Sequence, residues 1–153
     1  MVAAAADEER SGSDTAVRIL ANANKQPYVD LYWSNLYDEG VQRVAKTLQR
    51  DQSITGVGLG MNYISPMGAQ AVSVCLMVNR TLRQMHLPNN HFGDKGTIAI
   101  AGALTENDVL EEIDLRDCMV RWFAMREVAN LCPFDPKSMV VRIFWHCLCV
   151  GRN

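Results

Sequence analysis

Two groups of side chains in this 153-residue sequence have the make-up of reactive sites. His86, Asp114 and Arg142 recur at one constant interval, and a carboxylate beside an imidazole favours its protonated form, as an acid–base pair requires. The alternative is an exposed ladder of charges that contributes less than about 1 kcal/mol. The second group, at residues 146–149, has the sequence His-Cys-Leu-Cys and offers soft ligands for zinc, but two more ligands are missing. We therefore predict no catalytic residue, no metal and no cofactor.

Motifs that bind phosphate or activate a nucleophile are also missing from the sequence. The segment GVGLGM at residues 56–61 departs from the GxGxxG pattern, and its glycines alternate as they would along a strand. Neither a GxSxG elbow nor an HExxH pair is present. These observations indicate a protein that is not an enzyme.

The same interval extends well beyond the histidine and its neighbours. Gln26, Ile54, Leu82 and Leu110 each open the same pattern of aliphatic residues. Position four is Val29, Val57, Met85 and Ile113; position six is Leu31, Leu59, Leu87 and Leu115; position eleven is Leu36, Ile64, Phe92 and Val120. The sequence is therefore a tandem repeat, and its period of about 28 residues is within the range that marks repeat architectures.

Each repeat predicts one strand followed by one helix. Apolar residues alternate around positions four and six, which is the period of a strand with one buried face. From position thirteen onward they follow helical spacing. Because no single repeat can bury both faces, we expect neighbours to stack with a parallel sheet on one side and helices on the other.

This pattern resembles the leucine-rich repeats of the ribonuclease-inhibitor type. The segments from Leu82 to Asn107 and from Ile54 to Asn79 are similar to the LxxLxLxxNxIxxxGxxxLxxxLxxN unit of that family. The resemblance implies an α/β fold: a right-handed solenoid of about four to five repeats, with a concave parallel sheet and convex helices. Asn62 and Asn90, at position nine, are expected to bond the backbone of adjoining turns.

The repeats set the expected organisation of the chain. We predict a disordered acidic tail at 1–13, an N-terminal capping helix at 14–25, four repeats at 26–137, and a degenerate fifth strand with an incomplete end at 138–153. The sequence stops before a fifth helix, which leaves three alternatives: a fragment of a longer protein, a partner that completes the stack, or a tail that folds back. An uncapped edge strand also favours self-association.

Composition narrows the classes of partner. The formal charge is −2, from 15 basic and 17 acidic residues, so no nucleic acid is predicted. The sequence lacks an apolar run long enough to span a membrane, so no membrane partner is predicted. Five cysteines without a CxxC pair indicate reduced thiols. We therefore expect the cytoplasm or another reducing intracellular compartment, with the cytoskeleton or the cilium as options.

The repeat register predicts a binding surface on the concave side. Positions three, five, seven and eight of each strand are expected to face outward there. The predicted partner-binding residues are Tyr28, Asp30, Tyr32, Trp33, Gln84, His86, Glu112, Asp114, Arg116, Arg142, Phe144 and Trp145. Aromatic and arginine residues are the types that contribute most interface energy, although the same aromatics could pack internally. The three glycines at positions 56, 58 and 60 leave either room for an approaching partner segment or a strand without constraint.

The function that fits these observations is a protein–protein interaction module, a scaffold or subunit of a larger intracellular assembly. The partner would dock on the concave sheet or on the exposed C-terminal repeat edge. One alternative is a regulator of an enzyme such as a small GTPase, similar to the Ran GTPase-activating proteins, which share the repeat type. Another is an actin-capping domain similar to that of tropomodulin.

Overall fold

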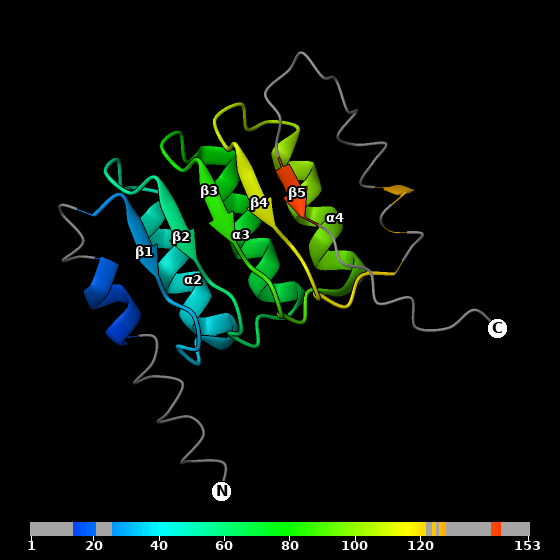
Figure 1. The fold of residues 1–153 in the computed structure, drawn as a ribbon, viewed down its shortest axis with the longest axis horizontal. Coiled ribbons are helices and arrows are strands. Elements are labelled where there is room, and N and C mark those ends of the chain that lie inside the picture. The colour runs from blue at the N-terminus through cyan, green and yellow to red at the C-terminus, as the bar shows by residue number, and fades with distance from the viewer. Residues whose placement is uncertain (1–13, 21–25, 122–123, 125, 128–141, 145–153) are drawn as a thin grey trace, which may run out of the picture.

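The computed structural model describes residues 14–20, 26–121, 124, 126–127 and 142–144. Strands and helices alternate along the chain as a single row of stacked repeats (Figure 1). The elements are β1 (Tyr28–Asp30), α2 (Tyr37–Leu48), β2 (Gly56–Gly58), α3 (Pro66–Val78), β3 (Gln84–His86), α4 (Gly93–Leu104), β4 (Glu112–Asp114) and β5 (Arg142–Phe144).

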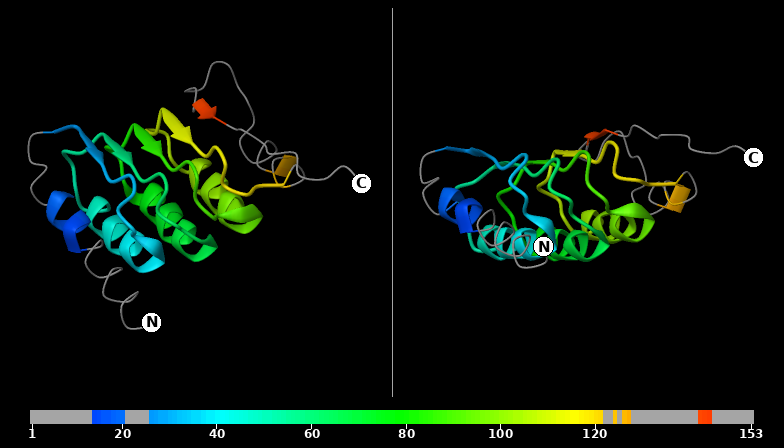
Figure 2. Two further views of the ribbon diagram at one scale, coloured as in Figure 1. Left: turned by 60° about the horizontal axis from the view of Figure 1, so that its bottom comes forward. Right: turned by 90° about the horizontal axis from the view of Figure 1, so that it is seen from below.

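The strands form one parallel sheet in chain order, from β1 to β5. Tyr28 pairs with Gly56, Gly56 with Gln84, and Gln84 with Glu112, so the spacing of the repeats is the register of the sheet. Figure 2 shows the helices as a second layer along one face of the sheet. This arrangement confirms the predicted α/β leucine-rich-repeat solenoid.

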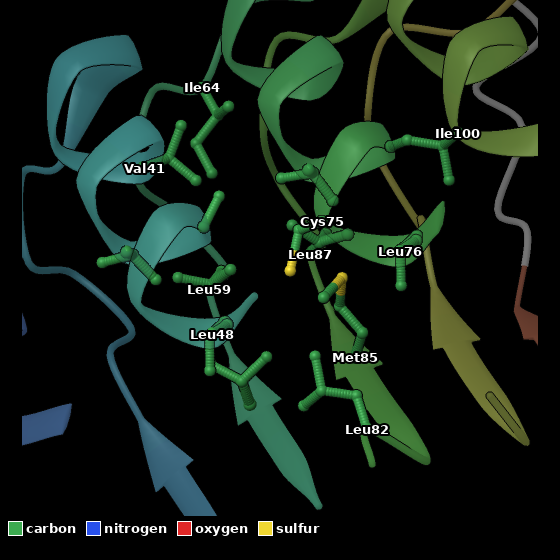
Figure 3. Packing of buried hydrophobic residues seen from close by; sticks show 14 of the residues in the cluster. Val41, Leu48, Leu59, Ile64, Cys75, Leu76, Leu82, Met85, Leu87 and Ile100 are labelled. Atoms are coloured by element: carbon green, nitrogen blue, oxygen red, sulfur yellow. The ribbon is translucent and has the colours of Figure 1, made fainter. Parts of the chain in front are cut away.

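The core lies between the two layers. Positions four and six of the strands point inward and meet helix residues such as Val41, Leu48 and Leu76, all of which are buried (Figure 3). Position eleven of the second and third repeats, Ile64 and Phe92, is also fully buried. Since each inward side chain packs against its own repeat and both neighbours, the core runs continuously along the stack.

Buried asparagines at position nine bond the turns after the strands. The Asn62 Oδ1 atom accepts the Ser34 N–H at 2.9 Å, and its Nδ2 group donates to the Leu31 carbonyl at 2.8 Å. Asn90 repeats this pattern one repeat later, accepting the N–H groups of Asn62 and Ile64. These side chains satisfy backbone groups that would otherwise be buried without partners, which confirms their predicted structural role.

A second set of polar side chains fixes the turns after the helices, at position twenty-six. Asn79 accepts the Leu82 N–H and donates to the Leu48 carbonyl, and Asn107 makes the equivalent bonds with Leu110 and Leu76. Asp51 occupies the same position in the first repeat. Burial acts to raise its pKa, but hydrogen bonds from Ile54 and Ser53 hold the pKa of Asp51 below its ordinary value. The strands that follow these turns are thus tied to the neighbouring repeat at both ends.

The helices pack closely because position fifteen is small. A Cβ atom added at Gly68 would lie 2.4 Å from the Ile64 side chain and 2.5 Å from the Asp38 carboxylate. That carboxylate accepts the N–H groups of Ser65 and Gly68 at 2.8 and 3.0 Å, and so joins α2 to the start of α3. Ser65 itself caps α3 ahead of Pro66.

Residues 14–20 form a helix at the first end of the stack (Figure 1). Ala16 and Leu20 are buried within the core, and Asp14 forms an ion pair with Arg43 of α2 at 2.5 Å. The remainder of the predicted capping segment, residues 21–25, lies outside the described residues. Across the part of the chain that is described, the helices are too short or too polar to cross a membrane.

The fifth strand does not keep the expected register. The repeat spacing places Arg142 opposite Asp114, whereas the sheet pairs Arg142 with Glu112 and Phe144 with Asp114. The predicted alignment of β5 on β4 was therefore wrong by two positions. A connection that is longer by two residues accounts for the change, and an even shift leaves the alternation of the strand intact.

Candidate functional site

The outward positions of β1 to β4 and the turns that follow form the concave side of the sheet. Position eight, three residues after the end of each strand, has a left-handed conformation, with φ of 56° or 57° at Trp33, Met61, Asn89 and Asp117. A side chain in this conformation costs about 1 kcal/mol, and its recurrence in four repeats marks it as part of the scaffold. The turn projects Trp33 into solvent, where 66% of its surface is exposed.

Two tyrosines of the first repeat cover the glycine strand. A Cβ atom added at Gly56 would lie 2.5 Å from the Tyr28 ring, and one added at Gly60 would lie 2.2 Å from the Tyr32 ring. A Cβ atom added at Gly58 would lie 2.7 Å from the Tyr32 ring and 2.8 Å from the Tyr28 hydroxyl. The space above β2 is therefore filled by the chain's own aromatic rings. Neither an approaching partner segment nor loss of constraint is needed to explain these glycines.

The tyrosine hydroxyls lie in a partly desolvated and acidic environment. Burial is the largest cause that raises the pKa of Tyr28, followed by the carboxylates of Asp30 and Glu112. Burial, Tyr28 and Asp114 raise the pKa of Tyr32 to about 12, against a smaller lowering effect of Arg116. Both phenols are thus neutral hydrogen-bonding groups at physiological pH.

His86 links the first repeat to the fourth across the glycine strand. The Tyr28 hydroxyl lies 3.2 Å from His86 Nδ1, and His86 Nε2 lies 3.2 Å from the Glu112 carboxylate. Because a carboxylate only accepts, Nε2 is the donor, and the Nδ1 atom of a neutral ring then accepts the Tyr28 proton. This connection was not expected from the sequence: the predicted partner of His86 was Asp114, its neighbour in register.

Asp114 is instead engaged by Arg116 two residues further along the chain. The Arg116 Nε atom lies 2.9 and 3.0 Å from the two carboxylate oxygens, and Nη2 lies 2.6 Å from one of them. Asp114 is buried while Arg116 remains half-exposed. The predicted ladder of His86, Asp114 and Arg142 is therefore wrong, because each of the first two has a better-placed partner and β5 is shifted.

The other predicted surface residues have simpler surroundings. Asp30 and Gln84 are exposed, and the Asp30 carboxylate accepts the Tyr32 N–H at 3.0 Å. Arg142 and Phe144 are placed in β5 by their backbone, and Trp145 lies outside the described residues. The structure thus brings Tyr28, His86 and Glu112 together.

An aromatic row on the strand-to-helix edge was missed by the sequence analysis. Tyr37 stacks on Tyr63 with ring centroids 5.2 Å apart, and Tyr63 meets His91 edge-on at 5.9 Å. These residues occupy positions ten and twelve, outside the strand positions used to map the surface. The sequence did contain a signal for this row: Tyr63 and His91 are aromatic residues at the same position of consecutive repeats.

The thiols in the described region, Cys75 and Cys118, are buried. Burial raises the pKa of Cys75 and of Cys118 to about 12. Among residues 14–20, 26–121, 124, 126–127 and 142–144, the acidic, histidine and cysteine side chains form no cluster that could hold a metal ion. The His-Cys-Leu-Cys segment at 146–149 lies outside these residues.

The chain is similar in sequence to proteins built from leucine-rich repeats. Ribonuclease inhibitor from Sus scrofa is 30% identical over 104 residues, which cover 66% of this chain and 23% of that protein. Leucine-rich repeat-containing protein 73 from Rattus norvegicus is 26% identical over 123 residues, covering 80% of this chain and 36% of that protein. This chain therefore spans about a third or less of the length of these relatives. No protein-family profile matches it.

A solved structure has a similar fold. The structure described as "Leiomodin-1 Actin-Binding Site 2 (ABS2)" superimposes with a TM-score of 0.76 at 21% identity, covering 88% of this chain and 79% of that one. At this level of identity the likeness concerns the fold alone.

Proposed function

Because the chain is a leucine-rich repeat protein of the ribonuclease-inhibitor-like type, we propose that it is a non-enzymatic protein-interaction module. It acts as a scaffold or subunit of a larger intracellular assembly, and the partner docks on the concave side of the sheet. The contacting residues are Tyr28, Asp30, Tyr32 and Trp33 at one end, with His86, Glu112 and Arg116 towards the other.

One observation carries this proposal: a large exposed indole stands beside two aromatic rings that are held in place. The left-handed turn after β1 fixes the backbone from which Trp33 projects, and the Tyr32 ring lies on the backbone of Gly58 and Gly60. Aromatic side chains that are immobile before binding lose little conformational entropy on association. Such anchors are the residue types that dominate interface energies.

The proposal is tested by placing a photo-crosslinking amino acid at position 33 of the full chain in cells of the native source. Crosslinks to a defined partner, recovered in a fixed ratio, are the expected result. The Trp33→Ala variant, used as bait in parallel, should lose at least about 90% of that partner, since a central aromatic anchor contributes about 2 kcal/mol or more.

The Tyr63→Ala variant is the matched control. Tyr63 is an exposed aromatic residue on the strand-to-helix edge, away from the concave positions. Its truncation should leave capture of the partner unchanged. Loss of the partner with Tyr63→Ala and retention with Trp33→Ala would reject the concave surface as the binding site.

Actin is a second candidate partner. The reason is the likeness in fold to the leiomodin-1 actin-binding site, which extends over 88% of this chain. A pyrene-actin elongation assay with the purified chain decides this candidate, because a filament-end binder slows elongation at substoichiometric amounts. Regulation of a small GTPase stays a prediction, and single-turnover GTP hydrolysis with and without the chain tests it.

A reducing intracellular compartment is proposed for the protein. Cys75 and Cys118 are free thiols in the described part of the chain, which fits such an environment. Fractionation of native cells with an antibody against the chain tests the compartment directly.

A further inference from the structure

The outward side of α3 is an apolar surface in the middle of the helix layer. Met67, Val74, Met77 and Val78 are each between 48% and 66% exposed, and they account for half of the exposed large hydrophobic residues in the described ranges. Residues 54–79 contain no charged side chain, although charged residues make up 21% of the chain. Apolar surface of this kind marks an interaction site more often than scattered exposure does.

These side chains form one stripe along the helix. Val74 lies seven residues after Met67, and Met77 and Val78 lie three and four residues after Val74, so all four share one side of α3, with Gln70 and Ala71 between them. Figures 1 and 2 show α3 between α2 and α4 in a single layer. The stripe is therefore bordered on both sides by the outward surfaces of neighbouring helices.

The bordering repeats have opposite charges at equal heights along the helix axis. At position fourteen, Glu39 and Lys95 lie on either side of Met67. At position twenty-five, Arg50 and Glu106 lie on either side of Val78. All four charged residues are exposed, and among the described residues none of them forms an ion pair.

We propose that a second copy of this chain covers α3, related to the first by a two-fold axis that runs along the helix. A half-turn about this axis places α3 on α3 of the second copy and α2 on its α4. Heights along the axis do not change, so Glu39 meets Lys95 of the second copy and Arg50 meets its Glu106. Each contact occurs twice, as in any isologous interface.

The residues between these charges also fit this arrangement. Lys46 at position twenty-one faces position twenty-one of α4, which is Gly102. A Cβ atom added at Gly102 would have nothing within 4 Å, so that position is open towards the second copy. In this dimer the Lys46 side chain thus lies over Gly102 of the second copy.

A two-fold axis across the helices gives a poorer fit. It reverses height and places α2 on α2 of the second copy. Glu39 then meets Arg50 and Lys95 meets Glu106, which are also opposite charges, but Lys46 meets Arg43. These are like charges, and their juxtaposition at an interface is unfavourable. The four exposed charges are paired in both cases, so the parallel arrangement of the two α3 helices is favoured by the contact of Lys46, which meets Gly102 there and Arg43 in the other arrangement. The concave sheets stay accessible in this dimer, so the inference does not depend on the proposed function.

Sedimentation equilibrium of the full chain measures the association. The native chain should be a reversible dimer at micromolar to hundred-micromolar concentration. Val74→Lys should raise the dissociation constant at least about tenfold, because the two introduced ammonium groups meet at the axis. Met119→Lys is the control: Met119 is 68% exposed in the turn after β4, and its substitution should leave the dimer unchanged.

A charge exchange tests the orientation. Glu39→Lys or Lys95→Glu alone should weaken the dimer about threefold or more, whereas the double variant should return to within about twofold of the native constant. Circular dichroism and thermal melting of each variant check that the fold is retained.

Three outcomes overturn the proposal. A native chain that remains monomeric has no such interface. A dimer that survives Val74→Lys uses another surface, such as the strand end beyond β4. A double variant weaker than either single variant places α2 on α2, and the parallel arrangement is then wrong.

Discussion

The second and fourth repeats share one scaffold but differ in almost every outward side chain. In the second, three glycines of β2 and the turn after it are buried under the tyrosines of the first repeat, and α3 is uncharged. In the fourth, β4 and its turn present Glu112, Asp114 and Arg116 in a network of hydrogen bonds. The inward residues of the two strands, Val57 and Ile113, are equally buried.

This difference separates two kinds of position. Positions four and six, together with nine in the second and third repeats, bury a side chain or satisfy backbone groups, and their residue types hardly vary. The outward positions are free of that requirement and differ from repeat to repeat. Position nine is where the two repeats begin to differ inside the scaffold, since Asn62 is replaced by Cys118.

The largest expected effect comes from removing the position-nine asparagine. Asn62→Ala removes the acceptor of the Ser34 and Leu36 N–H groups and the donor to the Leu31 carbonyl, and leaves the Gly60 carbonyl with the Trp33 N–H alone. We expect the free energy of unfolding to fall by about 3–5 kcal/mol in urea denaturation.

Cys118→Ala is the matched variant in the fourth repeat. The Cys118 Sγ atom contacts two carbonyl oxygens, of Leu87 and Arg116, and a thiol is a weak donor. Its loss should cost about 1 kcal/mol. Equal costs for the two substitutions would show that position nine has one role in both repeats.

The glycine strand is tested by adding one methyl group. Gly60→Ala forces the Tyr32 ring away from β2, because the new carbon would lie 2.2 Å from it. We expect a loss of about 1–2 kcal/mol in stability and a fall in the pKa of Tyr32 from about 12 towards 10.0 in a spectrophotometric titration.

Gly102→Ala provides the control for the same chemical change. That position has open space around it, and alanine favours a helix over glycine, so stability should rise by about 0.5–1 kcal/mol. If Gly60→Ala were also neutral or stabilising, the tyrosine rings could not be packed on the glycine strand in solution.

The joint between the third and fourth repeats depends on a carboxylate. Burial acts to raise the pKa of Asp94, but hydrogen bonds from the Arg121 backbone and side chain hold it below the ordinary value of 3.8. A lowered pKa in the folded state gives stability that is present above pH 3.8 and lost as pH falls through the folded pKa. Asp94→Asn should cost about 1 kcal/mol near neutral pH, since Arg121 is exposed, and should flatten the acid limb of a pH–stability curve.

The smallest difference between the second and fourth repeats is expected in the reactivity of their thiols, which should be low in both. With a pKa of about 12 and buried side chains, Cys75 and Cys118 should resist alkylation in the native protein at pH values near 8. Peptide-level mass spectrometry after iodoacetamide treatment measures each cysteine separately. Rapid labelling of Cys75 alone would show that α3 opens locally while the fourth repeat stays closed.

Much of the fold could be predicted from the sequence, because burial, hydrogen bonding and helix packing each require the same residue types in successive repeats. Burial of Leu59 and Leu87, the bonds of Asn62 and the small residue Gly68 are each required by contact with a similar unit one step away. Because each of these residues must fit the adjacent repeat, the register of one strand on the next is closely determined. The prediction failed at β5, where the connection is longer by two residues and the periodic requirement no longer applies.

The contacts on the concave side were harder to predict. Register identifies which residues are adjacent, but Tyr28 is long enough to cross a strand without side chains and reach His86, two strands away. Arg116 likewise satisfies Asp114 within its own strand end. Side-chain length and local pairing decide these contacts, and neither is visible in a periodic pattern.

The packing of Tyr28 and Tyr32 on β2 has a consequence for how this chain can vary. The space above the glycines of the second repeat is filled by tyrosine rings of the first. The residue types at positions 28 and 56 therefore constrain each other, and so do those at positions 32 and 60. A larger residue at one member of a pair is tolerated only with a smaller residue at the other. Homologous sequences that replace a glycine here should therefore also replace the tyrosine in the preceding repeat, a correlated exchange between positions one full repeat apart.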